Sequence, residues 1–160
     1  MSEQQPQPTF SIQKIYVKDA SVELPNAPRI FMEPHTPQIG VQLESVAERL
    51  AETVFEVVVT VTVTAKQEDK TCFLVEIAQA GIFEIAGIPE PELGPVLGIA
   101  CPNILFPYAR ETVADLVGRA GFPALHLAPV NFEAIYVERM QAEQAEQGAP
   151  GGASPIEIAH

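Results

Sequence analysis

The stretch that determines the fold is Thr53-Val-Phe-Glu-Val-Val-Val-Thr-Val-Thr-Val-Thr-Ala65, in which apolar side chains recur at every second position. Phe55 and Val63 belong to one set of alternate positions, whereas Glu56 and Thr64 belong to the other. A period of two places the two sets on opposite faces of a strand, and β-branched residues favour the extended backbone. This stretch therefore predicts a long strand with one buried face.

The neighbouring strand is expected to follow directly. Residues 67–69 read Gln-Glu-Asp, which favours a hairpin turn, and residues 71–85 are again rich in apolar side chains. We expect this second strand to bend at Ala80-Gly81, because glycine contributes no side chain to packing and weakens a strand.

Two earlier stretches also predict strands. Residues 10–24 alternate, and the apolar positions Ile39, Val41 and Leu43 indicate a shorter strand after a loop. Even-numbered and odd-numbered positions of residues 10–24 are expected on opposite faces of the strand. One face then carries Phe10, Ile12, Tyr16, Ala20, Val22 and Leu24, and the other carries Ile15, Val17, Asp19, Ser21 and Glu23.

The loop between these two strands, residues 26–38, contains Pro28, Pro34 and Pro37, which favour an extended, unpaired backbone. It nevertheless contains the apolar run Ile30-Phe-Met32. These side chains either fill the core or line a binding site, and the sequence alone favours neither alternative.

Two helices are expected after the strands. Residues 86–100 are rich in Gly and Pro and predict an irregular connection, and the first helix is expected from an Asn103 cap to Ala120, before Gly121. The second is expected from Asn131 to Met140. Strands followed by helices predict an α+β fold with a four-stranded antiparallel sheet and two helices packed on one side.

Charge limits the possible partners. The 160 residues carry 21 acidic and 9 basic side chains, a net charge of −12, which argues against nucleic acid and against an anionic membrane surface. Residues 94–130 carry only two acidic and two basic side chains, so we expect them to be buried in the chain, in an oligomer or beneath a partner. No apolar run is long enough to span a bilayer, so direct membrane insertion is not expected.

The N-terminal residues 1–9 lack the basic and apolar regions of a secretory signal, so we expect the protein to stay in the cytoplasm. We interpret Cys72 and Cys101 as reduced core residues. No glycine-rich phosphate loop and no metal-ligand spacing is present, so neither a nucleotide, a metal nor any other cofactor is expected. An enzyme with Cys101, His126 and Asp115 as nucleophile, base and orienting acid is the weaker alternative.

Acidic side chains recur on one predicted sheet face. Asp19 and Glu23 are four residues apart in a strand and therefore share a face, and Leu74 and Glu76 share a face of a second strand. Periodicity alone favours an ordinary solvated surface, but a rigid acidic face also suits docking of a cationic partner.

Five blocks of sequence resemble the SecB family of bacterial protein-export chaperones, in the order and spacing of that family. The most specific is Ile99-Ala-Cys-Pro-Asn-Ile-Leu-Phe-Pro-Tyr-Ala-Arg-Glu111. The others are Ile15-Tyr-Val-Lys-Asp19, Pro25-Asn-Ala-Pro28, Gly81-Ile-Phe-Glu-Ile-Ala-Gly87 and Leu127-Ala-Pro-Val-Asn-Phe132. The resemblance covers about residues 10–140, which implies a chaperone domain there, a disordered tail at residues 1–9 and a flexible tail at residues 141–160.

The resemblance implies an ATP-independent holdase, not an enzyme, that keeps unfolded preproteins competent for translocation and delivers them to the SecA ATPase. It implies a homotetramer, a dimer of dimers with the first helix between dimers. The positions that match the family's SecA-docking residues are Asp19, Glu23, Leu74 and Glu76. The implied interface positions are Val75, Ile77, Gln79, Asn103, Tyr108 and Val113.

The family's client groove lies between the Pro-rich crossover loop, the sheet and the second helix. The matching aromatic positions are Phe31, Phe73, Phe132 and Tyr136, for which core packing is the competing interpretation. This chain has His35 where better-known members have a tryptophan. Two alternatives remain open: a SecB-like chaperone specialised for one client, such as a toxin–antitoxin partner, and an adaptor that mainly recruits SecA.

Overall fold

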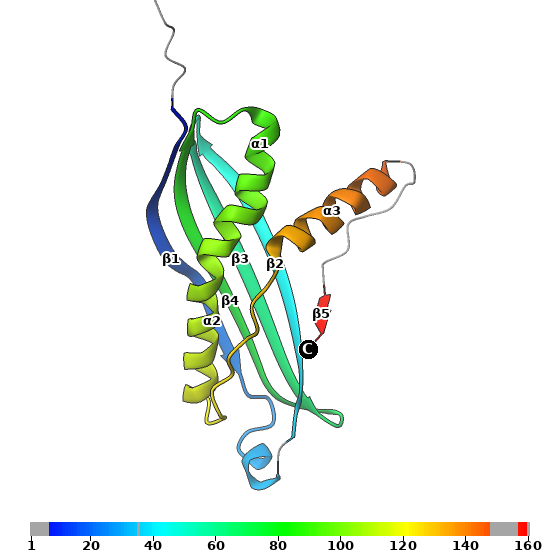
Figure 1. Ribbon diagram of the computed structural model, residues 1–160. Helices are drawn as coiled ribbons and strands as arrows, with labels where there is room; N and C mark the ends of the chain where they lie inside the picture. Colours follow the sequence, from blue (N-terminus) through cyan, green and yellow to red (C-terminus); the bar gives the residue numbers. More distant parts are fainter. Residues whose placement is uncertain (1–6, 35, 148–156, 160) are drawn as a thin grey trace, which may run out of the picture.

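The structure is a computed structural model that describes residues 7–34, 36–147 and 157–159. One long antiparallel sheet forms its body (Figure 1). The strands are β1 Thr9–Glu23, β2 Gln38–Ala51, β3 Val54–Gln67, β4 Lys70–Ala86 and β5 Glu157–Ala159, in the spatial order β1-β4-β3-β2-β5. The helices are α1 Glu90–Pro95, α2 Cys101–Arg119 and α3 Phe132–Glu146. The predicted α+β fold, with four antiparallel strands preceding the helices, is confirmed.

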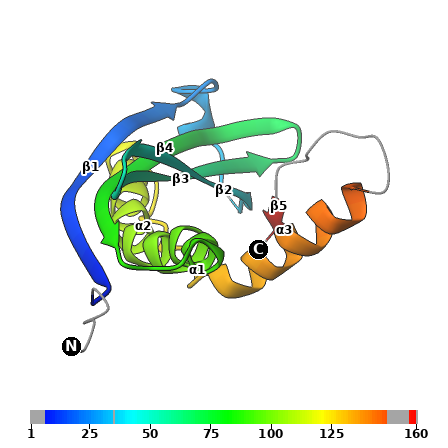
Figure 2. The same ribbon diagram turned by 90° about the horizontal axis from the view of Figure 1, so that it is seen from above.

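The alternating residues 54–65 form most of β3, in the middle of the sheet. Val57, Val59, Val61 and Val63 have no exposed surface, because α2 packs over this side of β3 and β4. We call this side the inner face, and Figure 2 shows α1 and α2 lying within its curvature. We call the opposite side, with the threonines at positions 60, 62 and 64, the outer face.

The ladder of β4 is unbroken at Ala80-Gly81, where the sequence predicts a bend. Gly81 pairs with Val57 on one side and with Ile15 on the other, so the ladder continues through it. The glycine serves a different purpose, because a Cβ atom there would lie 2.8 Å from the Phe83 ring and 2.9 Å from Leu105 on α2. Its missing side chain lets the helix approach the sheet closely.

β1 contains two bulges that simple parity did not reveal. Its register with β4 shifts between Ile12 and Lys14 and again between Val17 and Asp19. Each extra residue exchanges the two faces of the strand. The inner face of β1 is consequently apolar throughout, formed by Phe10, Ile12, Ile15, Val17, Ala20 and Val22. Tyr16 lies on the outer face instead, whereas Asp19 and Glu23 still share it.

The predicted irregular connection at residues 86–100 is helical from Glu90 onward, and the Asn103 cap is wrong. Helix α1 begins at Glu90, and a π turn at Val96–Ala100 joins it to α2, so Asn103 lies inside α2. Pro91 occupies the first turn of α1, where an amide donor is not needed. A π turn also accommodates a local break in the regular hydrogen-bond ladder next to prolines such as Pro102.

The end of α2 and the start of α3 agree with the prediction. Gly121 has a φ of 94°, a conformation that favours glycine, and the Asn131 side chain accepts a hydrogen bond of 3.0 Å from the Ala134 amide. Helix α3 continues past Met140 to Glu146 and projects beyond β2 (Figure 2). It packs on the π turn, so α2 alone covers the central strands.

The segments outside the main domain are described in part. Residues 1–6, 148–156 and 160 and His35 lie outside the described residues, and with them most of the two expected tails. Residues Glu157–Ala159 form β5 on the edge of β2, a strand that the sequence did not predict. Within the described residues, none of the helices is long and apolar enough to cross a bilayer.

Candidate functional site

The four positions expected to dock SecA lie together on the outer face. Glu23 on β1 is the register partner of Leu74 on β4, and two positions further along Ser21 is the partner of Glu76. Asp19 follows on the same face, opposite Ala78. Asp19, Glu23 and Glu76 are exposed, and Leu74 is half-buried between them. We call these four residues the acidic face, because three carboxylates surround one apolar side chain on adjacent strands.

The acidic face is held rigidly by its neighbours. Thr62 on β3 donates a hydrogen bond of 3.0 Å to the Glu76 carboxylate. Both strands of the face are paired along their whole length, and β4 is paired on both edges. The paired backbone of both strands and the bond from Thr62 to Glu76 give the acidic face a fixed framework, which favours orientation of a cationic partner.

A buried carboxylate anchors β1 next to this face. Glu56 on β3 accepts hydrogen bonds from the Tyr16 hydroxyl and from Lys18 Nζ, the latter at 2.9 Å, although β4 lies between the strands. The hydrogen bonds from Tyr16 and then from Lys18 lower the pKa of Glu56. Burial, and secondarily the bond to Glu56, raises the pKa of Tyr16 to about 12. Sequence reasoning missed this cluster, because the bulges move Tyr16 onto the face of Glu56.

The expected interface positions divide into two groups. Val75 and Ile77 are 0% exposed and Gln79 is 2% exposed, because all three lie on the inner face beneath α2. Val113 of α2 is also 0% exposed. These buried side chains have no exposed surface that a second copy could contact. A substitution at one of them would therefore affect assembly through the packing of α2. Asn103 and Tyr108, in contrast, point outward, and Tyr108 is 50% exposed.

The four aromatic positions expected to line the groove form two clusters rather than one wall. Phe31 of the crossover loop and Phe73 of β4 each stack on Phe122, with ring centroids 5.1 Å apart in both pairs. Phe132 packs edge-on against Phe106, at 5.8 Å. Phe73 and Phe132 are buried, which agrees with the core-packing interpretation for these two, whereas Phe31 is 42% exposed.

Tyr136 lies one helical turn after Phe132 on α3, and the position of its ring explains two glycines. A Cβ atom at Gly98 would lie 2.6 Å from its ring, and one at Gly94 would lie 2.8 Å from its hydroxyl. The ring of Tyr136 therefore rests on the backbone of α1 and the π turn. This contact fixes the start of α3 against the helices that cover the sheet.

The connector from Phe122 to Phe132 joins the two clusters. It runs between α2 and β2 (Figure 1) and borders a cavity of about 650 Å³. The apolar part of the lining includes Ile39 and Val41 on β2 and Leu125 and Leu127 on the connector. The sequence analysis did not predict these residues or Phe122 as part of a site. The run of apolar residues between Gly121 and Asn131 could have indicated that the connector lines one.

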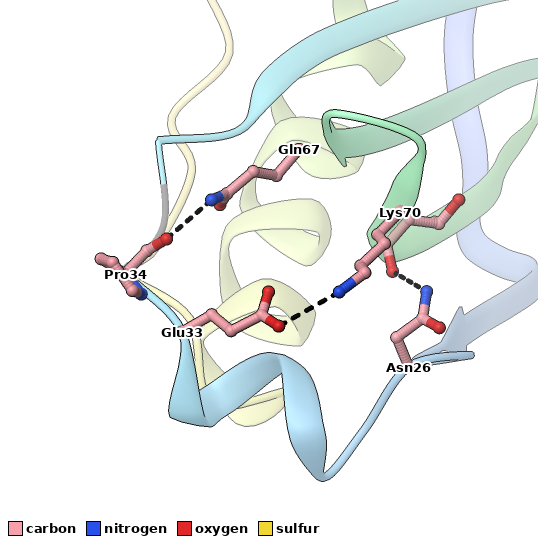
Figure 3. Close-up of polar contacts among 6 residues, drawn as sticks. Asn26, Glu33, Pro34, Gln67 and Lys70 are labelled. Carbon is pink, nitrogen blue, oxygen red and sulfur yellow. Dashed lines mark hydrogen bonds and ion pairs between the residues drawn. The ribbon is translucent and has the colours of Figure 1, made fainter.

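The crossover loop is tied to the β3–β4 hairpin by polar contacts (Figure 3). Gln67 Nε2 donates to the Pro34 carbonyl at 2.7 Å, and Lys70 Nζ lies 3.1 Å from the Glu33 carboxylate. Asn26 Nδ2 donates to the Thr71 carbonyl at 2.9 Å. We call this set the loop latch. It holds the 3-10 turn Arg29–Met32, and with it Phe31, at the hairpin end of the sheet.

The alternative catalytic constellation lacks an activated nucleophile. Cys101 has no exposed surface, and burial raises the pKa of its thiol to about 12, so it stays protonated at neutral pH. Burial likewise raises the pKa of Cys72. Among the residues that the structure describes, no group of three or more His, Cys, Asp or Glu side chains is arranged to hold a metal ion.

Comparisons with known proteins agree with the resemblance. The family model described as "Preprotein translocase subunit SecB" matches residues 3–143. The chain is 58% identical over 160 residues to "Protein-export protein SecB" of Nitrosospira multiformis, covering 100% of both chains. It is 61% identical over 149 residues to the protein of the same name from Chromobacterium violaceum, covering 92% of this chain and 99% of that one.

A solved structure shows the same fold at low sequence identity. It is a SecB-like chaperone of Mycobacterium tuberculosis in complex with a peptide from an antitoxin, 21% identical to this chain. The match covers 76% of this chain and 90% of that chain, with a TM-score of 0.64. The family model and the relatives span nearly the whole sequence. The chain therefore belongs to the SecB family of protein-export chaperones.

Proposed function

We propose that this protein is an ATP-independent holdase of the cytoplasm that binds unfolded preproteins and delivers them to SecA, without catalysing a reaction. The observation that carries the proposal is the separation of two surfaces. The acidic face occupies the outer side of β1 and β4, whereas the exposed apolar and aromatic groups of the crossover loop and connector lie elsewhere. A chaperone with separate surfaces can hold a client and dock a motor simultaneously.

Client binding is attributed to apolar contacts with the exposed Phe31, the half-buried Tyr136 and the connector cavity. Burial of apolar surface contributes roughly 25 cal/mol per Å², so affinity rises with the length of chain engaged and needs no specific sequence. A folded client hides these segments and is released. Neither step requires nucleotide hydrolysis.

Assembly as a dimer of dimers is part of the proposal. On the inner face of β1, Phe10, Ile12, Val17 and Val22 are 40–48% exposed, although they belong to the apolar face of the sheet. Because β1 is an edge strand, it exposes these apolar side chains together with unpaired backbone groups. A second copy of the chain can cover both. Asn103 and Tyr108 extend the open surface along α2.

The test reverses the charge of the acidic face. Asp19→Lys, Glu23→Lys and Glu76→Lys are combined in one variant, and SecA binding and arrest of preprotein refolding are both measured. The control carries the same charge change at the exposed positions Glu52, Glu92 and Glu146, which lie away from the acidic face and from Glu56. We expect at least a tenfold loss of SecA affinity in the first variant alone, with refolding arrest intact in both.

The outcomes separate the alternatives. If the acidic-face variant and its control bind SecA equally, the proposed docking face is wrong. If the unmodified protein binds SecA but leaves the refolding of every preprotein unchanged, the protein is an adaptor and the holdase proposal fails. If it arrests only one client among several, the single-client alternative replaces the general holdase.

A further inference from the structure

A second cavity lies at the hairpin end of the sheet, beside the loop latch. Its volume is about 400 Å³, and it is lined by residues of the crossover loop and by Lys70 at the start of β4. We call it the loop cavity. None of its described lining residues belongs to the acidic face, to the two aromatic clusters or to the connector cavity. The proposed function therefore leaves the loop cavity without a role.

The loop cavity carries a net positive charge. Its charged lining residues in the described part of the chain are Arg29, Glu33 and Lys70. Lys70 Nζ lies 3.1 Å from the Glu33 carboxylate, and Figure 3 shows this pair bridging the crossover loop and the hairpin. Arg29 is exposed, and no hydrogen bond or ion pair joins its side chain to another described residue. One guanidinium thus stays uncompensated in a chain of net charge −12.

Arg29 and Lys70 together offer more hydrogen-bond donors than the cavity uses. A guanidinium has five N–H donors in a planar fork, which matches the two oxygens of a carboxylate. The Lys70 ammonium has three donors, and Glu33 accepts one of them. Because both cations line one cavity, a carboxylate that enters it can accept from the Arg29 fork and from Lys70. Such charge-assisted hydrogen bonds are among the stronger ones in proteins.

Glu33 limits the charge that the cavity accepts. The two cations and the one carboxylate leave a single positive charge, which one carboxylate ligand neutralises. A dianionic phosphate would bring a second negative charge close to Glu33, and like charges at short distance repel each other. The charge balance therefore favours a carboxylate over a phosphate.

The rim of the cavity is held in place by its own contacts. Asn26 Nδ2 donates to the Thr71 carbonyl at 2.9 Å, and the Ile30 amide donates to the Asn26 carbonyl at 2.9 Å. Ile30 is 1% exposed and so anchors the loop in the core. Pro25 and Pro28 restrict the backbone of the rim. A rim that is ordered beforehand lowers the entropy cost of binding a ligand.

We propose that the loop cavity is a binding site for a single carboxylate group, held by Arg29 and Lys70. Two sources share this chemistry: the side chain of an Asp or Glu in a bound polypeptide, and a free C-terminal carboxylate. The site goes beyond the proposed function, in which clients are bound by apolar contacts and the acidic face takes a cationic partner. It provides one place for an anionic group on a chain that is otherwise strongly acidic.

The probe is the tripeptide Ala-Glu-Ala, acetylated at its N-terminus and amidated at its C-terminus, so that the glutamate side chain is its only carboxylate. The matched control is Ala-Gln-Ala with the same blocked ends. Acetylated Ala-Gln-Ala with a free C-terminus carries a terminal carboxylate instead and distinguishes the two sources. Inorganic phosphate at the same ionic strength tests the class of anion.

Two variants change the cavity in opposite directions. Arg29→Gln removes the guanidinium fork, whereas Glu33→Gln leaves Lys70 without its partner and raises the net charge of the cavity. The control Arg49→Gln makes the same charge change as Arg29→Gln at an exposed position near the far end of β2, a strand that begins beside the crossover loop at Gln38.

The measurement is a titration of the full chain followed by the NMR chemical shifts of the backbone amides in residues 26–33. We expect the glutamate peptide to shift these signals to saturation and the blocked glutamine peptide to leave them unchanged. Arg29→Gln should weaken binding of the glutamate peptide at least about threefold, and Arg49→Gln should leave it within about 1.5-fold. Glu33→Gln should strengthen it several-fold, a gain that loss of folded structure does not produce.

The inference is overturned if neither carboxylate peptide shifts the signals of residues 26–33, or if the blocked glutamine peptide binds equally well. Equal affinity of Arg29→Gln and the unmodified protein overturns it too. Tighter binding of phosphate than of both carboxylate peptides refutes the assignment of the ligand class. Arrest of preprotein refolding, measured separately on the unmodified protein, decides the proposed function, so the two failures are distinguishable.

Discussion

Lys18 Nζ on β1 lies 2.9 Å from the Glu56 carboxylate on β3, so an ion pair crosses the intervening strand β4 on the outer face of the sheet. The Glu56 side chain is 11% exposed, whereas that of Lys18 is 50% exposed. The Tyr16 hydroxyl donates to the same carboxylate. This cluster fixes the bulged part of β1 directly before Asp19, and thereby positions the acidic face.

Replacing Glu56 by Gln is expected to lower the free energy of unfolding by about 1–2 kcal/mol, because a largely buried, charge-assisted hydrogen bond is lost. Urea denaturation at pH 7 and one fixed protein concentration measures the change. The control is Glu44→Gln on the same face, where the side chain is exposed and the effect should stay within about 0.5 kcal/mol. Equal effects at the two positions would show that the cluster does not stabilise β1.

The stabilisation by Glu56 should depend on pH. Its folded-state pKa lies below the ordinary value of 4.5, so the stabilisation is complete above pH 4.5 and disappears as the pH falls through the folded-state pKa. The difference in unfolding free energy between the unmodified protein and Glu56→Gln should therefore shrink toward acidic pH. A difference that is constant from pH 3 to pH 7 contradicts the assignment for Glu56.

For Tyr16, whose pKa is raised to about 12, the stabilisation is present below pH 10 and declines between pH 10 and 12.

Gly81 and Gly118 provide a matched pair of glycine-to-alanine substitutions. A methyl group at Gly81 would collide with Phe83 and with Leu105 of α2, whereas one at Gly118 meets no atom within 4 Å. We expect Gly81→Ala to destabilise the protein by about 1–3 kcal/mol through overpacking. Gly118→Ala should stabilise α2 by roughly 0.5–1 kcal/mol. Thermal unfolding at matched concentration measures both, and a neutral Gly81→Ala would refute the close approach of α2.

The loop latch should control local rather than global stability. Its ion pair between Lys70 and Glu33 is exposed, and such pairs contribute only about 0–1 kcal/mol. The double substitution Gln67→Ala and Lys70→Ala should therefore accelerate hydrogen exchange in residues 26–34 several-fold while changing the global unfolding free energy by less than about 1 kcal/mol. Unchanged exchange in that loop would mean that the stacking of Phe31 on Phe122 suffices to hold it.

The sheet could be predicted from the sequence because its signal is local. Alternation in residues 53–65 predicts both the strand β3 and its buried face. The hairpin turn that follows predicts that β4 pairs with β3. The bulges in β1 were hidden, because an inserted residue reverses parity without changing composition. The apolar pairs Ile12 and Ile15, and Val17 and Ala20, are each three apart, and this spacing is their only local trace.

The start of the first helical region was predicted at Asn103 but lies at Glu90, because tertiary packing overrides the local preference of residues 90–100 for a loop. Gly94 and Gly98 suggest a loop when considered alone, but Tyr136, some forty residues later, needs both positions to be free of side chains. Strand parity correctly placed Asp19 with Glu23 on one face and Leu74 with Glu76 on one face. Their placement side by side depends on the pairing of β1 with β4, which parity does not give, and their role in SecA docking stays a prediction. The groove residues were split between two clusters because their contacts run through Phe122 and Phe106, which no pattern pairs with them.

Refolding kinetics distinguish a holdase that works without nucleotide from a protein that does not bind unfolded chains. A denatured preprotein is diluted into buffer with a stoichiometric amount of the full chain and no nucleotide, and recovery of its native fluorescence is followed. We expect recovery to slow at least several-fold, and an excess of a second unfolded protein to restore it. If recovery is as fast as with the same mass of serum albumin, the protein is not a holdase.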